Sequence, residues 1–266
     1  MAERGEIRKR VEAWRRDPGS SAILTDIDGT LAPIVPTPDM AKVSAEIKEH
    51  LRRSSEEYLL LAGISGRGTE DALALVGLVN IVYFGNHGFE ILREGEVEVI
   101  PEAVPYREKI DELERRAREE LEPLGAFVED KGITASIHFR NAPPEVGERS
   151  VDFVKAAGER LGLRITVGRG VVEARPPVRA DKGTAVRALV EEYGPKRAMF
   201  IGDDTTDLDA FRELAALCEE GELEEILRVG VSSDEGPSEI VSEADLAVEG
   251  VEGVEELLEA LLLDED

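Results

Sequence analysis

Two aspartates near the start of the chain are spaced so that they could act together on a phosphoryl group. Asp26 and Asp28 follow the apolar run Ala22–Thr25 within the segment Asp-Ile-Asp-Gly-Thr-Leu. One carboxylate can attack phosphorus to form an aspartyl-phosphate, while the other protonates the leaving oxygen and later deprotonates water. Like charges this close are costly unless a cation lies between them. An ordinary Asp-Gly turn would also explain the segment, so it is weak support by itself.

A second acidic group occurs in the segment Gly-Asp-Asp-Thr-Thr-Asp, which follows the apolar run Ala198–Ile201. Magnesium binds through one or two carboxylates and several waters, so Asp203 could complete a site begun by Asp26. Asp204 and Asp207 could hold the waters of the metal or fix the loop. An acidic helix N-cap explains one of these three aspartates well and all three together poorly.

Two further segments could bind the phosphoryl group. Ser65, Gly66 and Arg67 follow the apolar run Tyr58–Ala62, and a hydroxyl beside backbone N–H groups at a helix N-terminus forms an anion site. Lys182 opens another helical stretch and could meet the phosphate as a compact positive charge. Taken singly, Ser65 is better explained as a helix cap and Lys182 as a surface lysine.

These residues stand where apolar runs end or helical stretches begin, which predicts a parallel sheet covered by helices on both faces. Further apolar runs expected to be strands are Ile81–Phe84, Val229–Val231 and Asp245–Val248. The helical stretches are Thr69–Val76, Leu208–Leu217 and Val254–Leu263. Open sheets of this kind bind ligands at the carboxyl ends of their strands, so we expect an α/β, Rossmann-like core with its site at that edge.

The middle of the chain has a different order of elements. It contains the expected helices Tyr106–Leu121 and Glu145–Leu161 and the expected strands Ala126–Glu129, Ile133–Arg140, Arg164–Val167 and Val171–Arg175. Prolines 101, 105, 176 and 177 bracket this part. We therefore predict an inserted α+β cap domain over residues 105–177, within a discontinuous catalytic core of residues 1–104 and 178–266.

The composition restricts the partners. The 266 residues include 32 Lys and Arg against 58 Asp and Glu, a net charge of −26, which disfavours nucleic acid and anionic membranes. A single cysteine excludes an internal disulfide. The charged first residues and the lack of a long apolar run predict a cytoplasmic protein without signal peptide or membrane span. The sequence does not set the oligomeric state, and a monomer is the default expectation.

All four segments, in this order, resemble the motifs of the haloacid dehalogenase superfamily residue by residue. The resemblance implies that Asp26 is the nucleophile and Asp28 the general acid and base. It implies an Mg²⁺ site made by Asp26, Asp203 and the backbone carbonyl of Asp28, and it assigns Ser65 and Lys182 to the phosphoryl group. An α+β insertion between the second and third motifs is similar to the larger cap type of that superfamily.

The resemblance narrows to trehalose-6-phosphate phosphatases. The segments similar to that family span 26–34, 64–67, 85–88, 128–132, 138–140, 172–176 and 202–207. Ile27 departs from the pattern, because an aromatic residue is frequent there, but its side chain should point away from the metal. The resemblance implies a small-molecule sugar phosphate, trehalose 6-phosphate, as substrate.

Several polar residues are candidates to contact that substrate: Arg67, Asn86, His87, Glu129, Lys131, Arg140 and Glu173. In residues 133–140 apolar and polar side chains alternate, as in a half-buried strand, so a merely solvated sheet face would explain the cap residues equally well. Other sugar phosphates, such as sucrose phosphate or a glycosyl-phosphoglycerate, a phosphosugar mutase activity and a non-catalytic sensor remain as alternatives.

Overall fold

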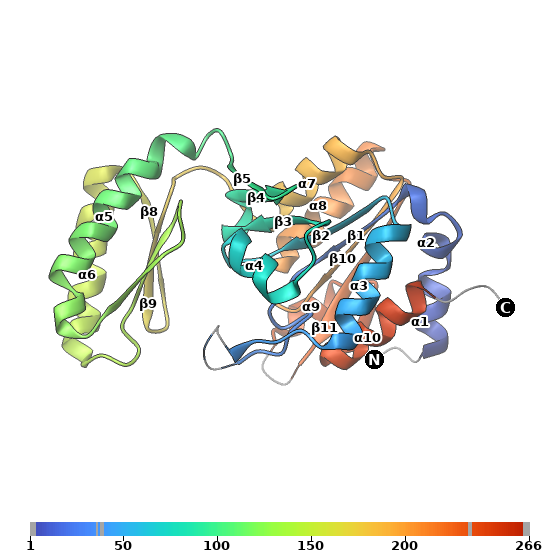
Figure 1. Cartoon of the computed structure of the whole chain (residues 1–266), viewed down its shortest axis with the longest axis horizontal. Coiled ribbons are helices and arrows are strands. Elements are labelled where there is room, and N and C mark those ends of the chain that lie inside the picture. Colours follow the sequence, from blue (N-terminus) through green and yellow to red (C-terminus); the bar gives the residue numbers. More distant parts are fainter. Residues whose placement is uncertain (1–3, 36, 38–39, 234–235, 263–266) are drawn as a thin grey trace. The chain divides into compact units, whose positions relative to one another are not determined.

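The computed structural model describes residues 4–35, 37, 40–233 and 236–262. The chain divides into two compact units (Figure 1). The first comprises Met1–Val97 with Ala180–Asp266, and the second, called the inserted unit below, comprises Glu98–Arg179. The inserted unit extends beyond the predicted insertion of 105–177 at both its N-terminal and its C-terminal boundary. No helix within the described ranges is both long and apolar enough to cross a membrane.

The first unit is built on an eight-stranded sheet in the order β12-β11-β10-β1-β2-β3-β4-β5. The strands are β1 (Ser21–Thr25), β2 (Leu60–Ile64), β3 (Val82–Gly85), β4 (Glu90–Arg93), β5 (Glu96–Val99), β10 (Arg197–Gly202), β11 (Glu225–Ser232) and β12 (Leu246–Glu249). The helices are α1 (Arg4–Arg10), α2 (Glu12–Arg16), α3 (Ala45–Glu57), α4 (Thr69–Val76), α7 (Lys182–Tyr193), α8 (Asp207–Glu220), α9 (Ser238–Ser242) and α10 (Gly250–Leu261). The six strands from β12 to β3 are parallel, which confirms the α/β class.

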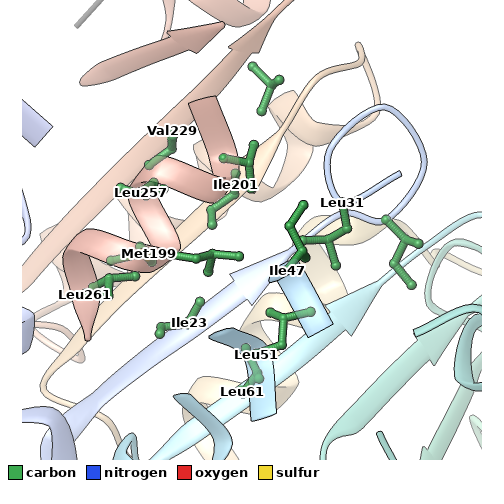
Figure 2. Close-up of a cluster of buried hydrophobic side chains, with 14 of the residues drawn as sticks. Ile23, Leu31, Ile47, Leu51, Leu61, Met199, Ile201, Val229, Leu257 and Leu261 are labelled. Atoms are coloured by element: carbon green, nitrogen blue, oxygen red, sulfur yellow. The ribbon is translucent and has the colours of Figure 1, made fainter. Parts of the chain in front are cut away.

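The central strands are buried on both faces because their apolar side chains alternate between two cores. On β1, Ile23 packs with α3 and α10, whereas Ala22 and Leu24 pack with α7 and α8. The neighbouring strand β10 divides its side chains in the same way. Figure 2 shows the first core, in which Ile23 and Met199 lie between Ile47 and Leu51 of α3 and Leu257 and Leu261 of α10. This double burial fixes the register of β1 and β10 and thereby the position of the residues that follow them.

Two features of this sheet were not predicted. Strand β2 begins at Leu60 rather than Tyr58, because Tyr58 still caps α3 with its N–H donated to Ser54 O. Strands β4 and β5 were missed because charged residues interrupt their apolar pattern. They are joined through Glu94 and Gly95, which adopt φ of 52° and 83°, the positive values that a tight hairpin turn requires. Residue 263 of the predicted last helix lies outside the described residues.

The inserted unit is a four-stranded antiparallel sheet in the order β6-β7-β9-β8. Its strands are β6 (Phe127–Asp130), β7 (Ala135–His138), β8 (Arg164–Gly168) and β9 (Val171–Arg175). Its helices, α5 (Arg107–Glu120) and α6 (Pro144–Leu161), bury their apolar faces against one side of this sheet (Figure 1). Each predicted strand and helix of this part is present, with ends displaced by at most a few residues.

One carboxylate lies inside this core. Glu114 on α5 is only 4% exposed, and its Oε1 atom has no hydrogen-bond partner in the described chain. Burial, reinforced by the negative charge of Asp130, raises the pKa of Glu114 to about 8. The folded protein therefore binds a proton that the unfolded chain, with an ordinary carboxyl pKa, releases. Stability contributed by the neutral acid is present below the unfolded pKa and is lost as pH rises toward 8.

We expect Glu114→Gln to stabilise the inserted unit at pH 8 by roughly 3–4 kcal/mol and to have little effect at pH 5, because the amide cannot ionise. The measurement is denaturant unfolding followed by circular dichroism at both pH values. Glu108→Gln, an exposed substitution on the same helix, is the control. A Glu114→Gln effect that is the same at pH 5 and pH 8 would show that Glu114 does not titrate in this range.

Candidate active site

Strands β1 and β10 are parallel neighbours whose carboxyl ends meet at one edge of the sheet. Thr25 pairs with Ile201, and the backbone N–H of Asp26 donates to Ile201 O at 2.8 Å. The residues that follow these strands are therefore held beside each other. Asp26 and Asp203 both come from this edge, and their residues are 4% and 6% exposed. Two loops far apart in the sequence thus bring buried carboxylates to one place.

Lys182 joins the carboxylates of this edge. Its residue is 3% exposed, and its Nζ lies 2.7 Å from Asp26 Oδ1 and 2.6 Å from Asp207 Oδ1. The lysine is the first residue of α7, whose start is fixed by a capping box between Asp181 and Thr184. Both carboxylates raise the pKa of Lys182 against the effect of its burial, so the amine remains charged. A buried lysine with two carboxylate partners is not a surface lysine.

Asp207 organises the loop that precedes α8. Its Oδ2 accepts hydrogen bonds from the backbone N–H groups of Asp203 at 3.0 Å and Asp204 at 2.9 Å. Its Oδ1 is occupied by Lys182. A side chain on Gly202 would collide with this carboxyl group, because a Cβ there would lie 2.4 Å from Asp207 Cγ. Since both oxygens of Asp207 are engaged by donors, the geometry suits it to fixing the loop.

Asp203 is held from the side of the first loop. Thr30 Oγ1 donates to Asp203 Oδ1 at 3.2 Å, and this threonine was not among the predicted site residues. Gly29, at φ 89°, lies so close that a Cβ there would be 2.0 Å from Asp203 Oδ2. A glycine is therefore required both by the backbone angle and by the approach of the carboxylate. The spacing of Thr30 from Asp28 gave no signal of this contact, because it depends on the packing of two loops.

The cluster of Asp26, Asp203, Asp207 and Lys182 carries an excess of negative charge. Burial raises the pKa of Asp26 well above its usual range, and the charges of Asp207 and Asp203 raise it further, against the opposing effect of Lys182. Burial, reinforced by Asp207, likewise raises the pKa of Asp203 to about 6. One lysine therefore does not balance three converging carboxylates.

A divalent cation fits this donor set. One carboxylate oxygen from each of Asp26, Asp203 and Asp207 lies within 4.8 Å of the others, and hard cations prefer oxygen ligands. Because both oxygens of Asp207 already accept hydrogen bonds, Asp26 and Asp203 are the side chains best placed to hold the ion. Such an ion would supply the positive charge that the cluster lacks and would offset the charge of a phosphoryl group.

Asp28 lies apart from that carboxylate cluster and is paired with Arg67. The guanidinium donates from Nε to Asp28 Oδ2 and from Nη2 to Asp28 Oδ1, both at 2.6 Å. The pair is partly buried, with 17% of the Arg67 and 30% of the Asp28 side chain exposed. A bidentate pair of this kind fixes the orientation of the carboxylate. Arg67 was predicted to contact the substrate. In the structure it is paired with Asp28, the residue predicted to act as both general acid and general base.

Ser65, Gly66, Asn86 and His87 are brought together by the loops that follow β2 and β3. Ser65 N donates to Phe84 O at 2.9 Å, and His87 N donates to Ser65 O at 3.0 Å. Asn86 and His87 adopt φ of 51° and 58°, values that only glycine adopts freely. The imidazole packs so closely on Gly66 that a Cβ there would lie 2.6 Å from His87 Cε1. Strained residues of this kind gather at functional sites, because the surrounding structure must hold them.

Asp204 lies outside the buried cluster. Its residue is exposed, and its Oδ1 accepts from the backbone N–H of Thr205 at 2.6 Å, within its own loop. The three aspartates of this loop therefore differ in their surroundings. Asp203 faces the first loop, Asp207 binds Lys182, and Asp204 closes a local turn.

The inserted unit has a second group of polar residues, on the sheet face opposite α5 and α6. This polar face carries Phe127, Glu129, Lys131, Ser136, His138 and Glu173. Glu129 Oε2 lies 2.8 Å from His138 Nε2 and 3.7 Å from Lys131 Nζ, and the hydrogen bond with His138 and the charge of Lys131 lower the pKa of Glu129.

Glu173 lies across the sheet from Glu129, because Ser136 pairs with both residues in register. Arg140 is placed differently from the other three predicted substrate residues of this unit. Its Nη2 donates to Arg169 O at 3.2 Å, beside the β8–β9 turn. Glu129, Lys131 and Glu173 are thus brought together, whereas Arg140 lies at another part of the unit.

Comparisons with known proteins agree with this architecture. Residues 24–248 match the model of the trehalose-phosphatase family. A trehalose-phosphate phosphatase of Mycobacterium marinum is 36% identical over 201 residues, which cover 71% of this chain and 50% of that protein. A probable trehalose-phosphate phosphatase of Arabidopsis thaliana is 34% identical over 223 residues, 73% of this chain and 58% of that protein. The chain therefore spans about half the length of the curated relatives it matches.

Two solved structures share the fold. A trehalose-6-phosphate phosphatase related protein superposes with a TM-score of 0.73 at 20% identity, covering 90% of this chain and 95% of that chain. The C-terminal domain of a Candida albicans trehalose-6-phosphate phosphatase gives a TM-score of 0.70 at 22% identity and covers 96% of each chain. At these identities the likeness establishes the arrangement of elements, which is that of the haloacid dehalogenase fold.

Proposed function

Because the chain belongs to the trehalose-phosphatase family, we propose that it hydrolyses trehalose 6-phosphate to trehalose and inorganic phosphate. We further propose that Mg²⁺ is the cofactor and that the reaction passes through an aspartyl-phosphate on Asp26. The observation that supports this most strongly is the buried contact of Asp26 with Lys182, beside Asp203, at the carboxyl edge of the sheet.

Asp26 is suited to the role of nucleophile. Its backbone N–H donates a hydrogen bond to Ile201 of β10, and Asp26 Oδ1 is paired with the Lys182 amine. The other carboxylate oxygen therefore has a defined direction. In the proposed first step this oxygen forms a bond to phosphorus while the bond from phosphorus to the sugar oxygen breaks. Lys182 stabilises the charge of the transferring phosphoryl group. Ser65, which directly precedes Gly66 after β2, offers a hydroxyl to the same group at the same edge of the sheet.

Asp28 is proposed to move the proton. The departing sugar oxygen takes a proton from the Asp28 carboxyl group, and trehalose leaves. In the second step Asp28 takes a proton from a water molecule, whose oxygen attacks phosphorus and releases phosphate from Asp26. The bidentate contact of Arg67 holds the Asp28 carboxylate in place between these steps, and the charge of Mg²⁺, when bound, offsets that of the phosphoryl group.

The sugar is proposed to be recognised by the inserted unit, acting as a cap domain. Sugars present many hydroxyl groups, and the polar face offers carboxylates and cations that can pair with them. Glu129, Lys131 and Glu173 are the residues we assign to this role. Asn86, His87 and Arg140 are assigned to the same role, although the hydrogen bonds described above join them to neighbouring protein groups.

We expect Glu129→Gln and Glu173→Gln each to lower kcat/KM for trehalose 6-phosphate by about tenfold to a hundredfold, because hydrogen bonds to a charged group contribute about 1.5–3 kcal/mol. A small aryl phosphate makes none of these contacts, so its hydrolysis should be nearly unchanged. The measurement is initial-rate kinetics on both substrates, with Glu159→Gln, an exposed change on α6, as control. Equal losses on both substrates would instead show that the residues support the fold.

A further inference from the structure

The polar face of the inserted unit carries one conspicuous apolar side chain. Phe127 has 61% of its surface exposed, and it is the single exposed aromatic residue within the described ranges of the chain. Aromatic residues make up only 5% of the sequence, and most of the others are buried in a core. Exposing a phenyl ring to water is unfavourable, and this ring lies among the charged and polar side chains of the same face.

The position of Phe127 is fixed by the sheet. Phe127 and Glu129 stand two residues apart on β6 and therefore face the same side, while Val128 between them is buried in the core. Phe127 pairs with His138 on β7, and their ring centres are 6.0 Å apart at an angle of 32°. His138 in turn contacts Glu129 at 2.8 Å. The ring thus lies beside a carboxylate whose orientation is set by two neighbours, His138 and Lys131.

We infer that Phe127 is the platform of a pyranose-stacking subsite on this polar face. The carbon–hydrogen face of a pyranose ring is apolar and packs on an aromatic ring, while its equatorial hydroxyls point outward to polar partners. Binding sites for small molecules combine such an apolar surface with a few placed polar groups. Here the phenyl ring is the apolar surface, and Glu129 is the acceptor for a hydroxyl at the edge of the same sugar. His138 positions Glu129.

This inference deepens the proposed function and rests on it for the identity of the sugar. It makes Phe127 a specificity-determining residue, because only a substrate that presents a pyranose face would use it. A flat hydrophobic contact would accept any apolar group of similar area. The aromatic ring and an aliphatic side chain of similar size are therefore expected to differ, and this difference is what the test must measure.

The first experiment compares Phe127→Ala, Phe127→Leu and Phe127→Trp. For trehalose 6-phosphate we expect kcat/KM to fall by about tenfold in the alanine variant, to fall by less in the leucine variant, and to be retained in the tryptophan variant. Acetyl phosphate, which has no ring to stack, should be hydrolysed equally by all four proteins. Because Phe127 is exposed, the variants should unfold at the same temperature as the parent protein.

Three kinetic outcomes would overturn the inference. The first is a Phe127→Ala variant with unchanged kcat/KM for trehalose 6-phosphate. The second is a loss of the same size on trehalose 6-phosphate and acetyl phosphate, because that would place the effect in the fold or the chemistry rather than in sugar recognition. A leucine variant as active as the parent would reduce the site to a hydrophobic contact and would also contradict stacking.

A second experiment does not depend on catalysis. In the Phe127→Trp variant, trehalose, maltose and sucrose should change the fluorescence of the new indole, while glycerol at the same concentration should not. Glu129→Ala in this background should weaken the response. No response to any of these sugars would overturn the inference. A response without hydrolysis of any sugar phosphate would keep the sugar site and would reject the proposed phosphatase activity.

Discussion

Asp26→Asn is expected to abolish turnover and to leave the protein folded. The amide cannot displace the sugar oxygen from phosphorus, so we expect kcat to fall by about 10⁶-fold, the size of loss that follows removal of the nucleophile of a serine protease. The fold should persist because the substitution is nearly isosteric and removes one negative charge from a cluster in which burial and like charges already raise the pKa of Asp26. The measurement is phosphate release by the purified variant, with its thermal unfolding recorded alongside.

A matched control is Asp204→Asn, which changes an exposed aspartate of the second acidic loop. Its activity should remain within a few-fold of the parent protein. Contaminating phosphatase is excluded by a dose-response of the preparation. Appreciable turnover by Asp26→Asn would then mean that another residue attacks phosphorus.

Removal of divalent metal is expected to stop the reaction and to leave the fold in place. Asp26, Asp203 and Asp207 converge within 4.8 Å, and the single positive charge of Lys182 contacts Asp26 and Asp207. An anionic phosphoryl group entering this cluster would meet further repulsion unless a cation is bound. Treatment with excess chelator should therefore reduce phosphate release to background, and added Mg²⁺ should restore it. Circular dichroism before and after chelation is the control for unfolding.

The response of the variants makes this test specific. Asp203→Asn should raise the Mg²⁺ concentration needed for half-maximal activity, because a neutral amide is a poorer partner for a hard cation. Asp204→Asn should not change that concentration, because its carboxylate faces its own loop. Undiminished turnover in excess chelator would contradict the proposed role of the metal.

Much of the frame could be predicted from the sequence, because burial on both faces gives the central strands continuous apolar runs. The runs before Asp26 and Asp203 mark strands β1 and β10, and the carboxyl ends of neighbouring parallel strands must meet. The alternation in 133–140 likewise identified the sheet of the inserted unit. Burial on both faces thus gave the continuous runs of β1 and β10, and burial on one face gave the alternation in 133–140.

Contacts between loops could not be predicted, because they depend on side-chain directions that spacing does not encode. Thr30 donates to Asp203, and Arg67 pairs with Asp28, across segments that are distant in the sequence. The sequence likewise showed Glu114 as one more charged residue on an amphipathic helix, although it is buried. Strands β4 and β5 were missed because a hairpin at the end of a sheet tolerates charged residues on its exposed side.

The most direct test of the account is the initial rate of phosphate release from a panel of sugar phosphates, with and without Mg²⁺, using Asp26→Asn as the blank. The panel contains trehalose 6-phosphate, sucrose phosphate, a glycosyl-phosphoglycerate and glucose 6-phosphate, and the sugar product is checked for isomerisation. We predict the highest kcat/KM for trehalose 6-phosphate, a requirement for Mg²⁺ and an unrearranged trehalose product. A higher kcat/KM for another sugar phosphate, an isomerised sugar phosphate as product, or no release from any of them would contradict it.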